Sequence, residues 1–453
     1  MKRRSFLNKS AAATFGFQFV PSHVVRAQDG RPTPNNRIRI GAIGCGGRGA
    51  ADLDGMKEED IVALCDIDHK HMGGSIKKFP GAKLFTDYRE MLETAGDEMD
   101  AVLVATPDHT HAVAVLAAIN HGKHVYCEKP LAHTIAEVRA MRKAALEKKV
   151  ITQVGNQGHS SDHIRLFCEM VWDGMIGEVT EVHAGCDAFK DVYCQIRKAV
   201  EFQKKHDVPE NVAWDLWLGP LPERPYHPNY LPFQWRGYSA FGSGCIGDWV
   251  CHVLDPTFWA LGLGMPTAVT AETKGYDPMV HSEFYPAGVK ITYEFAATEK
   301  NGPVKIIWHD GELGIPRPAE LAEGRKVVGT GAVVRGTEGV IMHGSHGAGG
   351  CRLIPETRMK DFKKPEQKLE RVPNGSHQKD WIEAIRSGKE AGSNFEYGGA
   401  LSEIGLLAMI AIRHTGKRLE WDADAMRFTN NELANTLIEP VYRDGWANAV
   451  GRL

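Results

Sequence analysis

The sequence predicts an α/β protein in two parts. A parallel, doubly wound sheet is expected over residues 37–157, followed over residues 158–453 by an α+β domain with a mainly antiparallel, open sheet. In the first part, apolar strand-like segments alternate with helical segments, which is typical of a parallel sheet. A glycine-rich turn follows the first of these strands. After residue 158 the strand-like segments instead alternate apolar and polar residues, as in an antiparallel sheet.

The first strand, residues 37–43, runs into the glycine-rich turn. Gly44, Gly46 and Gly49 have the G-x-G-x-x-G spacing, with Gly47 and Arg48 between them. The first glycine permits a tight turn, the second lets backbone N–H groups approach a diphosphate, and the third lets the next helix pack closely. The diphosphate would lie at the N-terminus of that helix, which favours an anion. The pattern predicts a dinucleotide site, and the alternative is a tight structural turn.

The second strand, residues 61–65, ends in Asp66, about twenty residues after the glycine turn, where an acid binds ribose hydroxyls. Ligands of parallel sheets bind at the carboxyl ends of the strands. Further strands are predicted at residues 99–105, 124–127 and 150–154, with helices at 112–120 and 135–148. We therefore expect one crevice to be lined by the glycine turn, Asp66, Thr106–His109, Glu128–Pro130 and Gly155–Gln157.

The second part carries a stretch rich in Trp, Pro and Tyr, residues 214–235. Aromatic side chains with polar tips suit a sugar ring, and the alternative is an aromatic core cluster. A loop is expected at the glycine-rich residues 344–350. Strands are predicted at residues 178–184, 268–271, 289–295 and 304–307, and helices at 376–387 and 399–415.

The N-terminus has the anatomy of a signal peptide. The paired arginines Arg3 and Arg4 precede a weakly apolar run, and Ala27 ends an approximate cleavage site. This segment resembles the bacterial twin-arginine export signal. We therefore expect residues 1–30 to lie outside the fold, and the protein to use the twin-arginine machinery and act in the periplasm. The alternative is a disordered basic tail.

Composition excludes several classes of partner. A net charge of −3 with 25% charged residues does not suggest nucleic acid. The sequence contains no run of 18 or more apolar residues, so no membrane span is predicted. Nine cysteines without a C-x-x-C pair do not form a disulfide framework.

The alternative of a metal site is weak, because its candidate ligands lack a recognised spacing, and no metal is predicted. Those candidates are His183, Asp187, Asp248 and His252.

Three residues are candidates for acid–base chemistry. Lys129 follows a strand and would point into the crevice, where its charge could stabilise an alkoxide. Taken alone, its position favours the alternative of a surface lysine at a strand end. Asp248 and His252 are four residues apart and share a helix face. Such a pair can hold an imidazole ready to accept a hydroxyl proton, or it can be a buried structural hydrogen bond.

Together these segments resemble the glucose–fructose oxidoreductase/inositol dehydrogenase family (Gfo/Idh/MocA). The resemblance rests on the glycine turn, Ala105-Thr106-Pro107 with His109, Glu128-Lys129-Pro130, and Asp248-x-x-x-His252-x-x-Asp255. It implies a Rossmann domain and a second domain whose open sheet often forms homo-oligomers. Lys129 and His252 would be the catalytic pair, with Asp248 placing the substrate. The nicotinamide side would be lined by Thr106, Pro107, His109, Glu128, Lys129 and Asn156.

The chain departs from the family pattern in two places. Val250 stands where D-x-G-x-H has glycine, and an insertion spans residues 190–228. Both concern the substrate more than the chemistry. Asp66 favours NAD over NADP because a carboxylate repels a 2′-phosphate, although Arg48 lies nearby.

The leading expectation is hydride transfer between NAD and a secondary carbinol of a sugar or cyclitol. Because an exported enzyme lacks a pool of free NAD, the cofactor should be held tightly. Two alternatives stay open. One is a redox-neutral NAD-dependent glycosidase that oxidises, eliminates, hydrates and reduces its glycoside. The other is a non-catalytic sugar-binding protein.

Overall fold

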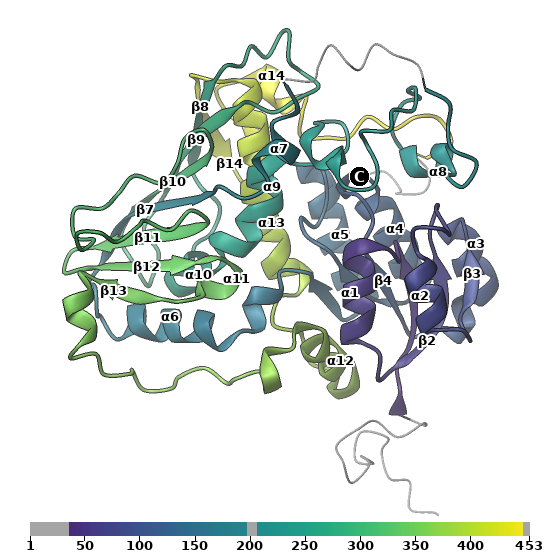
Figure 1. Cartoon of the computed structure of the whole chain (residues 1–453), viewed down its shortest axis with the longest axis horizontal. Helices are drawn as coiled ribbons and strands as arrows, with labels where there is room; N and C mark the ends of the chain where they lie inside the picture. The colour runs from purple at the N-terminus through teal and green to yellow at the C-terminus, as the bar shows by residue number, and fades with distance from the viewer. Residues whose placement is uncertain (1–35, 197–205, 447–453) are drawn as a thin grey trace, which may run out of the picture. The chain divides into compact units, whose positions relative to one another are not determined.

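The computed structural model describes residues 36–196 and 206–446. The signal-like segment, residues 1–30, lies outside the described residues. Figure 1 shows a six-stranded sheet in purple and blue beside a nine-stranded sheet in teal and green. This arrangement confirms the predicted fold class of a parallel α/β sheet followed by a mainly antiparallel one.

The first sheet has the strand order β3-β2-β1-β4-β5-β6, and every neighbouring pair is parallel. The order reverses between β1 and β4, which places a ligand crevice at the carboxyl ends of these strands. The elements are β1 (Arg39–Ile43), α1 (Gly47–Gly55), β2 (Asp60–Cys65), α2 (Gly73–Lys78), β3 (Lys83–Phe85), α3 (Tyr88–Ala95), β4 (Ala101–Val104), α4 (Asp108–Asn120), β5 (His124–Cys127), α5 (Ile135–Lys148) and β6 (Thr152–Val154).

The second sheet has the order β13-β12-β11-β7-β10-β9-β8-β14-β15, in which β7 and β10 are parallel and the other pairs antiparallel. Its strands are β7 (Val179–Cys186), β8 (Ala268–Lys274), β9 (Gly288–Phe295), β10 (Val304–Gly311), β11 (Gly331–Gly336), β12 (Val340–Gly344), β13 (Arg352–Ile354), β14 (Arg418–Asp422) and β15 (Arg427–Phe428). Its helices are α6 (Asp162–Trp172), α7 (Lys190–Tyr193), α8 (Trp214–Leu218), α9 (Gly244–Val253), α10 (Asp255–Leu261), the short turn α11 (Ser345–Ala348), α12 (His377–Ser387), α13 (Phe395–Arg413) and α14 (Glu432–Asn435).

Helix α13 lies between the two sheets and contacts α9, α5 and β8 (Figure 1). It is the one helix of the described residues that is long and apolar enough to cross a membrane, but 78% of its apolar window is buried inside the protein. That burial is typical of a core helix. Helix α13 thereby supports α9 beside the first sheet.

Two helices begin earlier than the sequence predicts. Helix α4 starts at Asp108 rather than at residue 112, because Pro107 has the extended conformation of an N-cap and Asp108 lies in the first turn. Helix α13 starts at Phe395 rather than at residue 399, because the Asn394 side chain accepts from the N–H of Tyr397. Helix α12 also returns to the first sheet, where Trp381 is buried against Tyr126.

Candidate active site

A cleft of about 1190 Å³ joins the carboxyl ends of the parallel strands to helix α9. Parallel strands end at one edge of a sheet, so side chains far apart in the sequence meet there. Eleven of the sequence-predicted site residues line it: Gly44, Gly46, Gly47, Arg48, Asp66, Thr106, Pro107, Glu128, Lys129, Asp248 and His252. The structure therefore brings the predicted cofactor and catalytic residues into one cavity.

The glycine turn has the geometry that its spacing predicts. Gly44 has a φ of +81°, and a Cβ there would lie 2.6 Å from the carbonyl oxygen of Ala105. A Cβ on Gly49 would lie 1.9 Å from the carbonyl oxygen of Gly44, so only glycine lets α1 pack this closely. No side chain caps the start of α1 and no acid lies in its first turn. The leading N–H groups of α1 therefore suit a dinucleotide diphosphate.

Asp66 lies at the end of β2, facing the same turn. Its carboxylate accepts hydrogen bonds from the backbone N–H of Cys45 (2.8 Å) and of Asp68 (3.0 Å). Burial raises its pKa, and the backbone donors only partly offset that effect. The donors nevertheless hold the carboxylate in a defined position in the cleft, where ribose hydroxyls can donate to it.

Lys129 and Asp248 form an ion pair at the other end of the cleft, although they are 119 residues apart. The second oxygen of Asp248 accepts from the Tyr193 hydroxyl and lies 3.5 Å from Nε of Arg236. Tyr193 in turn accepts from the indole N–H of Trp249 at 2.9 Å. This network ties the loop after β5 to helix α9.

The charges of this ion pair decide its chemistry. Burial alone would lower the pKa of Lys129, but Asp248 and Glu128 reverse the shift and raise it. Burial would raise the pKa of Asp248, but Lys129 and Arg236 lower it overall. Lys129 therefore stays protonated, and it can stabilise a negative oxygen but cannot act as a base at neutral pH.

His252 lies on α9 one turn after Asp248, yet the carboxylate bonds to Lys129, Tyr193 and Arg236 rather than to this imidazole. The predicted Asp–His hydrogen bond is thus replaced, because cationic partners compete better for a buried carboxylate. Nδ1 of His252 is buried and has no partner among the described residues. Burial, followed by the charge of Lys129, holds its pKa well below the ordinary value. His252 is therefore neutral and can accept a proton.

Glu128 lies beneath the glycine turn, next to Lys129. It accepts from Nε2 of Gln157 at 3.1 Å and lies 3.5 Å from Nε of Arg48. Burial, followed by the charge of Asp52, raises its pKa to about 8.

The segment 206–236 also lines the cleft, through residues that include Asn211, Val212, Leu216 and Trp217. Ala213 donates its N–H to the carbonyl oxygen of Ile67 at 3.1 Å, directly after Asp66. The Trp214 and Trp217 rings stack with centroids 4.9 Å apart. This strap, as we call residues 206–236, is therefore attached to the first sheet and packed by its own aromatic cluster.

Two models of one oxidoreductase family match the chain. The model described as an NAD-binding Rossmann fold matches residues 38–156, and the model described as a C-terminal alpha/beta domain matches residues 165–307 and 321–448. The chain belongs to the Gfo/Idh/MocA oxidoreductase family. The family resemblance predicted from the sequence is thereby confirmed.

Relatives within the family include sugar and cyclitol dehydrogenases. Inositol 2-dehydrogenase of Rubrobacter xylanophilus is 32% identical over 149 residues, which are 32% of this chain and 42% of that protein. Levoglucosan dehydrogenase of Pseudarthrobacter phenanthrenivorans is 28% identical over 39% of this chain and 36% of that protein. The matched region is thus about half or less of these curated relatives. A structure of scyllo-inositol dehydrogenase from Lactobacillus casei with NAD(H) and scyllo-inositol shares the fold, with a TM-score of 0.54 at 16% identity over 85% of this chain and 99% of that one.

Three of the residues assigned from the family pattern lie outside the lining of the cleft: Gly49, His109 and Asn156. The ring nitrogens of His109 lie next to two backbone oxygens, Nε2 at 2.8 Å from that of Trp217 and Nδ1 at 3.3 Å from that of Phe241. Burial lowers its pKa to about 3, so the neutral ring donates to one of them, and the shorter contact is to Trp217. Asn156 is buried and donates to Asp255 at 3.0 Å, while its Oδ1 has no partner among the described residues. In this family member, His109 fastens the strap to α4.

Sequence reasoning missed one residue that lines the cleft, His346, and one residue that bonds to the cleft residues Asp248 and Trp249, Tyr193. Tyr193 bridges Asp248 and Trp249, but it lies in the insertion, where no pattern marked it. His346 lies in the glycine-rich loop after β12 and stacks on His252, with ring centroids 4.1 Å apart. A histidine within Gly-Ser-His-Gly-Ala-Gly-Gly was an available signal, since polar residues in glycine-rich turns often serve function.

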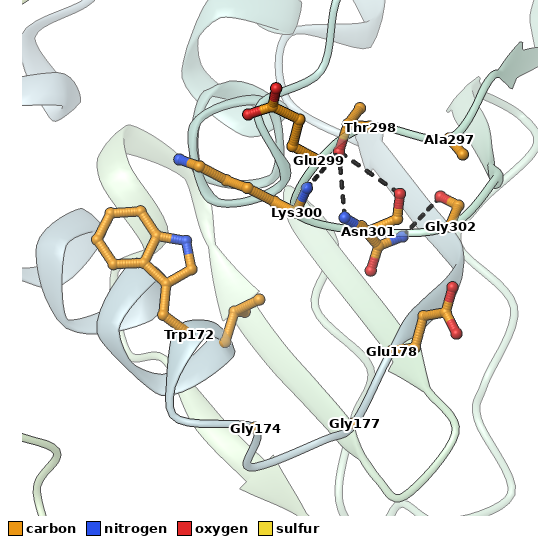
Figure 2. Close-up of a pocket in the computed structure, with 11 residues that line it drawn as sticks. Trp172, Gly174, Gly177, Glu178, Ala297, Thr298, Glu299, Lys300, Asn301 and Gly302 are labelled. Atoms are coloured by element: carbon orange, nitrogen blue, oxygen red, sulfur yellow. Dashed lines mark hydrogen bonds between the residues drawn. The ribbon is translucent and has the colours of Figure 1, made fainter.

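A second hollow of about 860 Å³ opens between the end of α6 and the loop after β9 (Figure 2). Lys300 lies over the ring of Trp172 at 4.9 Å, and the loop is closed by hydrogen bonds from Lys300 and Asn301 to Thr298. None of the predicted site residues lines this hollow.

Proposed function

We propose that this protein is an NAD-dependent oxidoreductase that transfers a hydride to or from a secondary carbinol of a sugar or cyclitol, with a tightly held cofactor. The observation that carries the proposal is the meeting of a protonated Lys129 and a neutral His252 in the same cleft as the glycine turn. The names of the inositol and levoglucosan dehydrogenase relatives support the substrate class.

Three residues of the chain would each have a separate role in such a reaction. Bound NAD would supply the hydride acceptor. His252, held neutral by burial, accepts the hydroxyl proton on Nε2, the ring nitrogen other than the buried Nδ1. The Lys129 ammonium stabilises the negative charge that develops on the substrate oxygen. Asp248 keeps Lys129 charged and in place.

The cofactor would be held by two groups of residues. The N–H groups at the start of α1 would receive the diphosphate, and Asp66 the ribose hydroxyls. The strap would cover part of the nucleotide, because Ala213 bonds to Ile67 next to Asp66 and several strap residues line the cleft. A covered dinucleotide exchanges slowly, as an exported enzyme requires.

Asp66→Asn is expected to lower the preference for NAD over NADP by at least about tenfold. The change removes the charge that repels a 2′-phosphate, and the amide oxygen still accepts from one of the two backbone donors, Cys45 or Asp68. Dissociation constants for both dinucleotides, measured with protein stripped of cofactor, check this. Asp87→Asn, another carboxylate at the cleft, is the control. An unchanged ratio in Asp66→Asn would contradict the assignment.

The proposal as a whole is tested by denaturing freshly purified protein and analysing the released small molecules. A stoichiometric dinucleotide is expected. Free sugars, inositols and glycosides are then screened for NADH absorbance and for product release. Absence of bound dinucleotide together with absence of hydride transfer would overturn the proposal and favour a sugar-binding protein.

The outer part of the cleft favours the redox-neutral glycosidase as a second candidate. Phe189 is 53% exposed and lies 5.7 Å from Phe233 and 6.2 Å from Trp249 between ring centroids. All three line the cleft. Aromatic faces beyond the catalytic end suit a second ring, such as an aglycone. Aglycone release without net NADH would identify this activity, and NADH without cleavage would exclude it.

Export and assembly complete the proposal. The paired arginines support twin-arginine export, which is tested by fusing residues 1–30 to a folded reporter and replacing both arginines by lysine. The family resemblance supports a homo-oligomer formed through the open second sheet. Light scattering of the purified protein gives the oligomeric state.

A further inference from the structure

His346 lies in the turn after β12, where the backbone is strained. His346 has a φ of +54° and Ala348 a φ of +61°, in the left-handed region that side chains rarely adopt. Gly347 between them interlocks with the loop before α6, because a Cβ on it would lie 2.1 Å from the carbonyl oxygen of Gly158. Backbone strain of this kind persists where the surroundings enforce it.

The turn presents the His346 ring to the cleft. The ring stacks on His252 at 4.1 Å with an interplanar angle of 20°, and it meets the edge of Trp249 at 5.6 Å. Its Nδ1 lies 2.9 Å from the Ser345 hydroxyl. Nε2 is therefore the nitrogen that remains for a ligand, and it belongs to a residue that lines the cleft.

The charges around His346 keep it neutral. Burial lowers its pKa, as do Lys129 and Arg48, whereas Asp248 raises it. A neutral imidazole can donate to or accept from a hydroxyl group. Two neutral imidazoles that stack 4.1 Å apart and both line the cleft thus offer two hydrogen-bonding groups to one substrate ring.

We propose that His346 is a specificity-determining residue that binds the hydroxyl group next to the reacting carbinol, so that the site selects a vicinal diol. This inference rests on the proposed function. His252 serves the hydroxyl group that is oxidised, and His346 serves its neighbour. A ring without that neighbouring hydroxyl leaves Nε2 of His346 without its partner, which penalises binding.

The test compares D-glucose, myo-inositol, methyl β-D-glucoside and methyl β-D-galactoside with their monodeoxy analogues. In the wild-type protein, removal of the hydroxyl next to the oxidised carbon is expected to lower kcat/KM by about 10–100-fold. In His346→Gly, which suits the left-handed backbone, the two substrates of a pair should differ by less than about threefold. His346→Phe keeps a stacked ring without nitrogen and should lose the discrimination equally. His281→Gly, outside the cleft lining, is the control.

Calorimetric binding of the same compounds to NAD-loaded protein should show the same loss of discrimination. The inference is overturned if both variants still discriminate between hydroxy and deoxy substrates, or if His346→Phe restores this discrimination. It is also overturned if His346→Gly lowers kcat/KM equally for the hydroxy and deoxy substrates. Failure of the proposed function is distinguishable, because no compound would then give hydride transfer in the wild-type protein.

Discussion

Lys129→Met is expected to lower kcat by about 10³-fold while the bound dinucleotide stays near one per chain. The substitution keeps most of the side-chain volume and removes the ammonium group that stabilises the developing alkoxide, an effect typically worth about 10²–10³ in rate. Stopped-flow measurement of hydride transfer, with cofactor content determined on the same sample, checks this.

The matched control is Lys300→Met, which removes a lysine that lies over Trp172 in the second hollow. It should leave kcat within about twofold of wild type. A Lys129→Met protein with wild-type hydride transfer would show that the ion pair with Asp248 only stabilises the fold, and the assignment of Lys129 would be abandoned.

His252→Phe is expected to lower kcat by about 10²–10⁴-fold, because it removes the proton acceptor but keeps a ring to stack on His346. The pH profile carries the more specific signature. The imidazole must be neutral to act, so kcat/KM of the wild-type protein rises with pH through the pKa of His252. Burial and Lys129 place that pKa well below 6.5, so the rise lies on the acid side.

The variant should lose this acid limb, since no group titrates in its place. A pH profile of His252→Phe with the same acid limb as the wild type would assign that limb to another group and remove His252 as the base. Thermal unfolding of the variant separates a loss of chemistry from a loss of folding.

Several features of the first sheet could be predicted because their signals are local. The spacing of Gly44, Gly46 and Gly49 requires neighbours in the sequence only, and each strand end follows from a short apolar run. Asp66 and Lys129 follow the ends of two such strands, which places both residues at the same edge of the sheet. The cleft confirms that the segments meet, since parallel strands of one sheet end at the same edge.

The partners within the site could not be predicted in the same way. Helical spacing places Asp248 and His252 on one face, but it says nothing of Lys129, whose approach depends on how α9 docks beside the first sheet. In the sequence the strap appears as an insertion and an aromatic-rich stretch, residues 214–235, without a sign of where it attaches. Its contact through Ala213 is a backbone hydrogen bond, which any residue can form, and its contact through His109 joins a side chain to a backbone oxygen 108 residues away.

The family, the glycine turn and the candidate residues Asp66, Lys129 and His252 could thus be recognised from the sequence. The pairing of Asp248 with Lys129 and the stacking of His252 on His346 became visible in the folded structure. Helical and strand periodicities act over a few residues, whereas these contacts join separate elements of the two sheets. Their geometry is set by packing of the whole core around α13, which no local pattern encodes.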